Sequence, residues 1–196
     1  MLRPLGHHGV MDPRAPDGVR QLWILRHAKA AAEGPWGTRD RDRTLTTRGR
    51  RDASALGARL AAGAPLLGTP GLVRPEVALC SAAVRTVQTA ELVLAEFPDR
   101  VPFDSYRSLY EAGPDTVLTY LREVDEHVRS VLVVGHNPTM FHLTWDLLEP
   151  GSGDRDTLEA RGFPTCALAV LSLRVEAWED AADGTAALSG LFAPPY

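Results

Sequence analysis

The sequence predicts an α/β fold, a three-layer α/β/α sandwich around one central and mostly parallel sheet. Two apolar segments, 21–26 and 131–134, have the composition of buried strands, and each runs directly into a histidine. The segments between such runs carry apolar residues at spacings of three and four, which is typical of amphipathic helices. Strands that alternate with helices favour a parallel sheet, because right-handed crossovers place the helices on both of its faces.

The first strand is predicted at 21–26, and a surface loop that includes the charged run 39–43 follows it. Thr46 or Thr47 is a good N-cap for a helix that ends near Gly63. The predicted apolar face of this helix consists of Ala53, Leu56, Gly57 and Leu60.

The next strand is predicted at 75–80, and Ser81 at its end is expected to cap the following helix. This helix carries Arg85 in its first turn. Its predicted apolar stripe consists of Val84, Val87, Ala90 and Leu94.

A further helix is predicted to begin at Pro114, because proline at the first helical position needs no intrahelical partner for its nitrogen. Its expected buried residues are Val117, Leu118, Leu121 and Val124. The segment 131–134 is apolar throughout and mostly β-branched, which predicts a strand in the centre of a parallel sheet.

Asn137 and Pro138 are expected to cap the helix that follows this strand. The apolar stripe predicted for it consists of Met140, Leu143 and Leu147. The remaining chain is predicted to form a loop at 151–154 and strands at 166–173 and 186–192.

Chain length and composition favour one domain. The 196 residues are 44% hydrophobic, which suffices for one core and is too little for two comfortable domains. We expect residues 1–20 to form a flexible N-terminal tail, because prolines, glycines and the pair His7-His8 occur there without periodicity. Residues 21–196 then form the single domain.

The net charge indicates which classes of partner to expect, and the cysteines indicate the cellular compartment. A net charge of -4 gives no general attraction to nucleic acid or anionic membranes, so neither is expected as a partner. No stretch approaches the about 20 apolar residues of a membrane span, and the N-terminus lacks the apolar core of a secretory signal. Cys80 and Cys166 lie in apolar runs, as buried thiols do. These features predict a cytoplasmic protein.

Histidine and arginine side chains follow three of the predicted strands. Arg26 and His27 end the first strand, Arg85 follows the second, and His136 follows 131–134. Open α/β sheets keep their active sites beyond the carboxyl ends of the strands. The planar fork of arginine can hold two phosphoryl oxygens, and an imidazole can attack phosphorus to give a covalent intermediate.

Short motifs surround these residues in a characteristic order. They are Arg26-His27-Ala28-Lys29, Leu45-Thr46-Thr47-Arg48-Gly49, Leu79-Cys80-Ser81, Gln88-Thr89-Ala90, Leu109-Tyr110-Glu111-Ala112, Val134-Gly135-His136-Asn137-Pro138 and Phe163-Pro164-Thr165. In these motifs the chain resembles the histidine phosphatase superfamily, also called the phosphoglycerate mutase-like superfamily. The Arg-His-Ala-Lys form, in place of the commoner Arg-His-Gly, is similar to the small SixA-like phosphohistidine phosphatases.

The resemblance implies a phosphoglycerate mutase-like sandwich and a role for each matched residue. His27 would be the nucleophile that becomes a phosphohistidine, and His136 would donate a hydrogen bond to the transferring phosphoryl group. Arg26 and Arg85 would bind its oxygens. We expect neither a metal nor another cofactor, because the arginines supply the positive charge and the chain has no close-set cluster with metal-ligand spacing.

Four further residues near the motif arginines and histidines each have two interpretations. Ser81 and Asn137 stand at predicted helix starts, where backbone amides favour an anion, although simple capping also explains them. Lys29 and Arg48 would add positive potential at the rim of the site or be solvated surface charges.

Glu111 bears on the substrate class. An alkoxide leaving group needs a proton that a positioned carboxylic acid provides, whereas the imidazole released from phosphohistidine can be protonated from solvent. Glu111 is therefore interpreted either as a general acid or as a structural residue.

The expected substrate is a phosphorylated protein carrying phosphohistidine, as for SixA-like enzymes, because little chain is left over to build a lid. One alternative is a phosphatase of small phosphomonoesters with Glu111 as its acid. A non-catalytic phosphate-binding module is the third interpretation.

Overall fold

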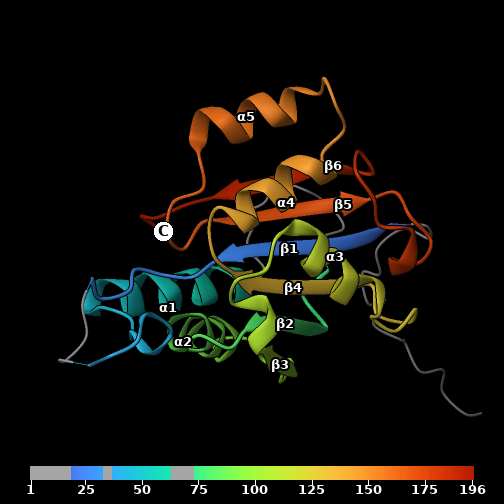
Figure 1. The fold of residues 1–196 in the computed structure, drawn as a ribbon. Coiled ribbons are helices and arrows are strands. Elements are labelled where there is room, and N and C mark those ends of the chain that lie inside the picture. The colour runs from blue at the N-terminus through green and yellow to red at the C-terminus, as the bar shows by residue number, and fades with distance from the viewer. Residues whose placement is uncertain (1–18, 33–36, 63–72) are drawn as a thin grey trace, which may run out of the picture.

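The computed structural model describes residues 19–32, 37–62 and 73–196. Within these residues six strands form one sheet in the order β3-β2-β4-β1-β5-β6 (Figure 1). The strands are β1 (Arg20–Arg26), β2 (Val77–Ser81), β3 (Phe103–Tyr106), β4 (Ser130–Gly135), β5 (Leu168–Leu173) and β6 (Ala186–Phe192).

Two types of helix connect the strands. The α-helices are α1 (Thr47–Ala61), α2 (Val84–Leu94), α3 (Pro114–Arg122), α4 (Thr139–Leu147) and α5 (Gly153–Arg161). The short 3-10 helices are η1 (Asp40–Asp42), η3 (Arg107–Leu109) and η4 (Trp178–Asp180).

The strand directions make the sheet mixed. Strands β3, β2, β4 and β1 run parallel to one another, so their carboxyl ends lie on one edge of the sheet. Strand β5 is antiparallel to β1, and β6 is antiparallel to β5, as the arrows in Figure 1 show. The predicted central strand, β4, lies between two parallel neighbours.

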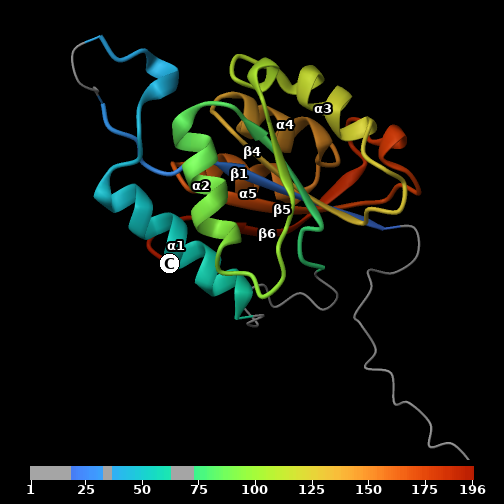
Figure 2. The same cartoon turned by 90° about the horizontal axis from the view of Figure 1, so that it is seen from below.

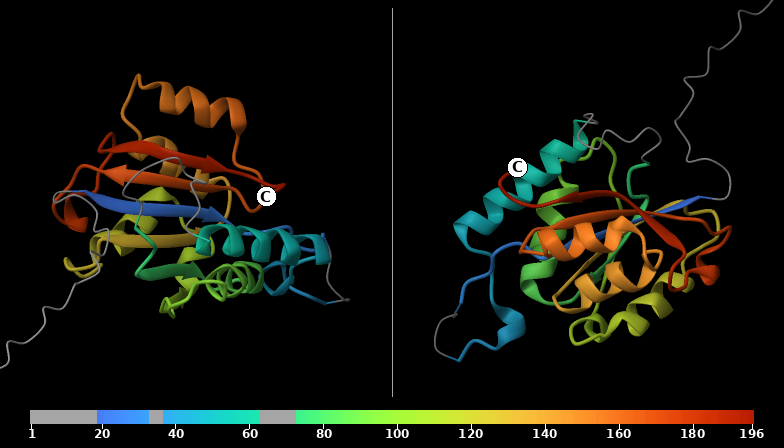
Figure 3. Two further views of the ribbon diagram at one scale, coloured as in Figure 1. Left: turned by 180° about the vertical axis from the view of Figure 1, so that it is seen from behind. Right: turned by 90° about the horizontal axis from the view of Figure 1, so that it is seen from above.

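Helices cover both faces of the sheet, which confirms the predicted sandwich (Figures 2 and 3). Alternate residues of β1 separate the two layers: Trp23 and Leu25 pack with α1 and α2, whereas Leu22 and Ile24 pack with α3 and α4. This alternation follows from the two-residue period of a strand. Leu158 of α5 belongs to the second layer.

Most predicted elements are confirmed. Thr46 caps α1 by accepting a hydrogen bond from the Gly49 amide, and Pro114 begins α3 at the first helical position. The predicted faces of α1 and α4 are buried. Cys80 and Cys166 are buried free thiols.

Three local predictions are wrong. The segment that begins with Gly153 is helix α5 rather than only a loop. In α2, Thr86, Thr89 and Val93 are buried together with Ala90 and Leu94, whereas Val84 and Val87 are only partly buried. Neither Ser81 nor Asn137 caps a helix: the cap positions of α2 and α4 are Ala83 and Pro138, without side-chain capping bonds.

Several expectations fall on residues that the structure does not describe. Residues 1–18 of the predicted tail and the predicted helix end at Gly63 lie outside the described residues, and the described part of α1 ends at Ala61. In the described part of the chain, no helix has the length and apolarity that a bilayer crossing requires.

Candidate active site

The two motif histidines meet at the ends of adjacent strands. Arg26 of β1 lies opposite Gly135 of β4 in the parallel register, so His27 and His136 follow at the same level. The His27 amide donates to the Gly135 carbonyl at 3.0 Å, and the two imidazole ring centroids are 5.2 Å apart.

The orientation of His27 leaves one ring nitrogen free to react. Its Nδ1 lies 2.8 Å from the Ala28 carbonyl, and because a carbonyl can only accept, Nδ1 carries the hydrogen. The lone pair of Nε2 is then available. Burial, followed by the charges of Arg85 and Arg26, lowers the pKa of His27 to about 4. The imidazole is therefore neutral near pH 7, as a nucleophile must be.

His136 is held by a residue from a third strand end. Its Nε2 lies 2.8 Å from the hydroxyl oxygen of Ser81, the last residue of β2. The ring of Tyr110 meets it edge-on with centroids 5.5 Å apart. Burial and the neighbouring His27 lower the pKa of His136 to about 3. Its buried Nδ1 has no hydrogen-bond partner among the described residues.

Arg26 and Asn137 are anchored on the same carbonyl. Arg26 Nη1 donates to the Phe163 oxygen at 2.8 Å, and Asn137 Nδ2 donates to it at 2.9 Å. Within the described chain, the buried Nε of Arg26 has no partner. The Phe163 carbonyl therefore holds one end of the Arg26 guanidinium group in place.

Arg85 is buried and engages the charged run 39–43. Its Nη1 donates to the Asp40 carbonyl oxygen at 2.8 Å, and its Nη2 donates to Asp40 Oδ2 at 3.0 Å. The guanidinium carbon lies 5.7 Å from the ring centre of Tyr110. The buried Nε of Arg85 is also without a partner in the described residues.

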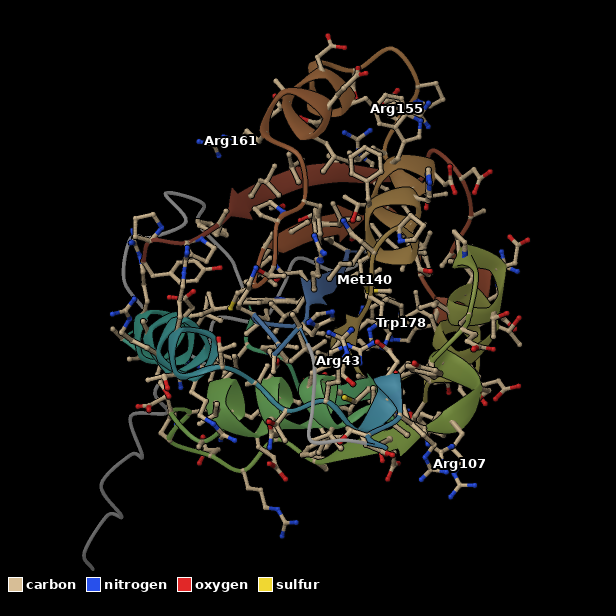
Figure 4. All side chains as sticks on the ribbon, turned by 60° about the vertical axis from the view of Figure 1, so that its left-hand side comes forward. Arg43, Arg107, Met140, Arg155, Arg161 and Trp178 are labelled. Atoms are coloured by element: carbon tan, nitrogen blue, oxygen red, sulfur yellow. The ribbon has the colours of Figure 1, made fainter. Side chains whose placement is uncertain are left out.

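Asp40 is a residue of the candidate site that the sequence did not single out, since the run 39–43 was expected to be a surface loop. Its carboxylate accepts from Arg85, from Arg43 and from the Tyr110 hydroxyl. These donors hold the pKa of Asp40 well below its usual range. Figure 4 shows Arg43 near the centre of this end of the molecule. Nothing in the alternating charges distinguishes Asp40 from Asp42, so the sequence carried no usable signal.

Three other predicted residues are exposed on the surface of the protein. Lys29, Arg48 and Glu111 are exposed, and Arg48 lies 3.4 Å from Asp52 of its own helix. Tyr110, rather than its neighbour Glu111, contacts His136. The roles suggested for Lys29 and Glu111 stay predictions.

The donor set favours anion binding over metal binding. In residues 19–32, 37–62 and 73–196, no three His, Cys, Asp or Glu side chains are grouped so that they could hold a metal ion. Two guanidinium groups, those of Arg26 and Arg85, instead lie close enough to the paired imidazoles for their charges to lower the imidazole pKa values. Such an arrangement can bind a phosphoryl group and supply a nitrogen nucleophile to it.

Comparison with known proteins places this geometry in context. The model of the histidine phosphatase superfamily (branch 1) matches residues 22–116, which include His27 and Arg85. An uncharacterized protein of Mycobacterium tuberculosis strain H37Rv is 36% identical over 172 residues, covering 87% of this chain and 99% of that protein.

Solved structures of similar proteins cover nearly the whole chain. A protein named as a candidate phosphohistidine phosphatase SixA, from Nakamurella multipartitia, has a TM-score of 0.74 and 34% identity over 92% of this chain and 99% of its own. A protein histidine phosphatase SixA complexed with tungstate has a TM-score of 0.67 and 27% identity, over 89% of this chain and 97% of its own.

Proposed function

This chain belongs to the histidine phosphatase superfamily, and from that premise we propose that it removes phosphoryl groups from phosphohistidine side chains of proteins. The reaction proceeds through a phosphohistidine formed on His27. The observation that carries the proposal is the pair His27 and His136, 5.2 Å apart, with the reactive Nε2 of His27 left free by the Nδ1 contact to Ala28.

The proposed chemistry has two displacements at phosphorus. Arg26 and Arg85 bind the phosphoryl oxygens through their guanidinium groups. His27 Nε2 attacks phosphorus, and the bond from phosphorus to the substrate nitrogen breaks. Water then attacks the phosphorus of the intermediate, and inorganic phosphate leaves. Each step is easier than one direct displacement by water.

His136 donates a hydrogen bond to the transferring group in this proposal. In this proposal the Ser81 hydroxyl donates to Nε2, 2.8 Å away, so that the hydrogen of the neutral ring lies on Nδ1, the buried nitrogen without a partner among the described residues. Ser81 is thus a positioning residue that sets the tautomer of His136. A neutral imidazole can donate this bond without repelling the neighbouring arginines.

Phosphohistidine is favoured over phosphate monoesters as the substrate. The similar proteins with more than 25% identity include one named a candidate phosphohistidine phosphatase SixA and one named a protein histidine phosphatase SixA. Glu111 is exposed, and the carboxyl group that does reach the site, Asp40, is ionised and has no proton to give an alkoxide. Phosphohistidine does not need an acid from the enzyme, because its imidazole leaving group already carries a proton.

The proposed setting is the cytoplasm. Cys80 and Cys166 are both buried free thiols, which fits a reducing compartment. The net charge of -4 supports a partner other than nucleic acid or an anionic membrane.

A substrate comparison tests the proposal. The hydrolysis rates of a phosphohistidine-bearing protein and of a panel of phosphate monoesters are measured with the same enzyme. We expect the phosphohistidine protein to be hydrolysed with the higher kcat/KM. A large preference for the monoesters would overturn the proposal and favour a small-molecule phosphatase with Glu111 as its acid.

A further inference from the structure

Asp40 lies at the solvent side of the proposed phosphoryl site. Its side chain is 52% exposed, whereas that of Arg85, with which it pairs, is 7% exposed. The leaving group of an in-line displacement lies opposite the attacking nitrogen. Asp40 is the exposed partner of the buried Arg85, so a protein side chain that brings its phosphoryl group to Arg85 from solvent passes Asp40.

The hydrogen bonds of Asp40 are complete in the free protein. Oδ2 accepts from Arg85 Nη2 and from the Tyr110 hydroxyl, and Oδ1 accepts from Nε and Nη2 of Arg43. An ionised carboxylate offers about four acceptor sites, so all of them are used. A phosphoryl group that binds Arg85 competes with Asp40 for the same guanidinium and leaves Oδ2 one donor short.

We propose that Asp40 is a specificity-determining residue that selects N-phosphorylated substrates over phosphate monoesters. The inference rests on the proposed function and extends it. A phosphorylated imidazole with a proton on its other nitrogen brings an anion for Arg85 and an N–H donor for Asp40 in one molecule. A monoester brings the anion alone, so its negative charge faces an Asp40 carboxylate that has lost a donor.

The proton and electron balance follows from this contact. His27 Nε2 uses its lone pair to bond phosphorus, and the electron pair of the broken P–N bond stays on the substrate nitrogen. The proton already on the other ring nitrogen, hydrogen-bonded to Asp40, makes the leaving imidazole neutral. Water then cleaves the phosphohistidine to inorganic phosphate. Asp40 acts as an acceptor throughout, which agrees with the donors that keep it ionised.

Three small substrates test the inference without contributions from protein docking. They are free N-phosphohistidine, phosphoramidate and para-nitrophenyl phosphate. For Asp40→Asn we expect kcat/KM on the two nitrogen-linked substrates to fall about tenfold, or roughly 1.4 kcal/mol. We expect kcat/KM on the aryl phosphate to rise, because the variant removes the negative charge that faces this substrate. Equal losses on all three substrates would mean that Asp40 merely orients Arg85, and would overturn the inference.

Asp42→Asn is the matched control. Asp42 lies in the same loop but pairs with Arg39 and Arg41, so kcat/KM on every substrate should stay unchanged. Asp40→Glu retains the charge and should retain the preference. Asp40→Ser, which is also neutral, takes the place of Asp40→Asn if circular dichroism finds the latter unfolded.

The wild-type enzyme separates the two proposals. If it shows no preference for nitrogen-linked substrates, the proposed function fails whatever the variants do. If it shows that preference and Asp40→Asn keeps it in full, only the inference about Asp40 fails.

Discussion

Neutral imidazoles beside two guanidinium groups are the main feature of the site at the residue scale. Burial is the largest cause of the low pKa of both His27 and His136, and nearby positive charges act in the same direction. The Ala28 carbonyl and the Ser81 hydroxyl then orient the two rings. Phosphoryl transfer depends on such preorganised groups, because they need not rearrange during the reaction.

Both histidines should remain neutral well below pH 7. Their pKa values in the folded protein, about 4 and about 3, lie below the about 6.5 of an unfolded chain. Their contribution to stability is therefore complete above pH of about 6.5 and is lost as the pH falls through the folded values. NMR titration of the imidazole signals measures this directly. A midpoint near 6.5 for either ring would contradict the account.

Arg85→Ala should cost about 2 to 4 kcal/mol of transition-state stabilisation, by analogy with the loss of one oxyanion donor. This corresponds to a roughly thirtyfold to thousandfold fall in kcat/KM. Arg85→Lys should recover only part of it, because an ammonium group lacks the two-pronged geometry. Steady-state kinetics on an aryl phosphate measures both variants.

Arg41→Ala is the control for the arginine prediction. The Arg41 guanidinium lies 3.7 Å from Asp42, and both side chains are substantially exposed, so turnover of a small aryl phosphate should hardly change. Equal losses in Arg85→Ala and Arg41→Ala would show that the site is assigned wrongly.

At the scale of elements, helices with a strong apolar periodicity could be predicted from the sequence. Helices that bury few apolar residues could not. Helix α1 has a cap and a continuous apolar face, so its sequence revealed it. Helix α5 buries only Leu158 and is tied to β6 by polar bonds, from the Leu188 amide to Asp154 and from Arg161 to the Leu191 carbonyl. Such bonds leave no apolar period in the sequence.

The buried face of α2 was predicted wrongly because it includes polar residues. The hydroxyls of Thr86 and Thr89 donate to backbone carbonyls, at 2.7 Å to Ser81 and 2.6 Å to Arg85. Because these hydroxyl groups are hydrogen-bonded, the two threonines can be buried. A search for apolar residues at helical spacing does not find them. Thr89 also accepts from the Ala28 amide at 3.0 Å, which links α2 to the residue after His27.

The first turn of α1 packs directly on the chain that follows His27. A Cβ atom added at Gly49 would lie 2.2 Å from the Lys29 carbonyl oxygen. Because this neighbour is backbone, Gly49→Ala should cost about 1 to 3 kcal/mol of folding free energy and lower the Tm by about 2 to 4 °C for each kcal/mol. It should also lower kcat/KM by displacing the loop after His27.

Gly153→Ala in α5 is the matched control, because a Cβ there has no neighbour within 4 Å. Alanine should be neutral or stabilise the helix by up to about 1 kcal/mol. Thermal unfolding of both variants checks the pair, and equal Tm values would refute the close approach at Gly49.

Across the whole molecule, the sequence predicted which strand ends bear residues of the candidate site. It did not predict which loops contribute further contacts to that site. Arg26, His27 and His136 follow from buried strands that end in polar residues. The Phe163 carbonyl and Asp40 reach the site from segments far away in the chain. Their contributions depend on tertiary packing, for which one sequence contains no local pattern.

Exhaustive chelation should leave activity intact. The arginines at the strand ends supply the positive charge that a divalent cation would otherwise bring to the phosphoryl oxygens. Turnover of an aryl phosphate before and after EDTA treatment measures this. Loss of activity that added Mg²⁺ or Zn²⁺ restores would contradict the expectation.

The central claim is that His27 carries the phosphoryl group between substrate and water. Rapid quenching of the enzyme with radiolabelled phosphohistidine protein, followed by peptide mapping, tests it most directly. The account predicts an acid-labile, alkali-stable label on the peptide that contains His27, and neither label nor turnover in His27→Ala. A label on another residue, or substantial turnover by His27→Ala, would contradict it.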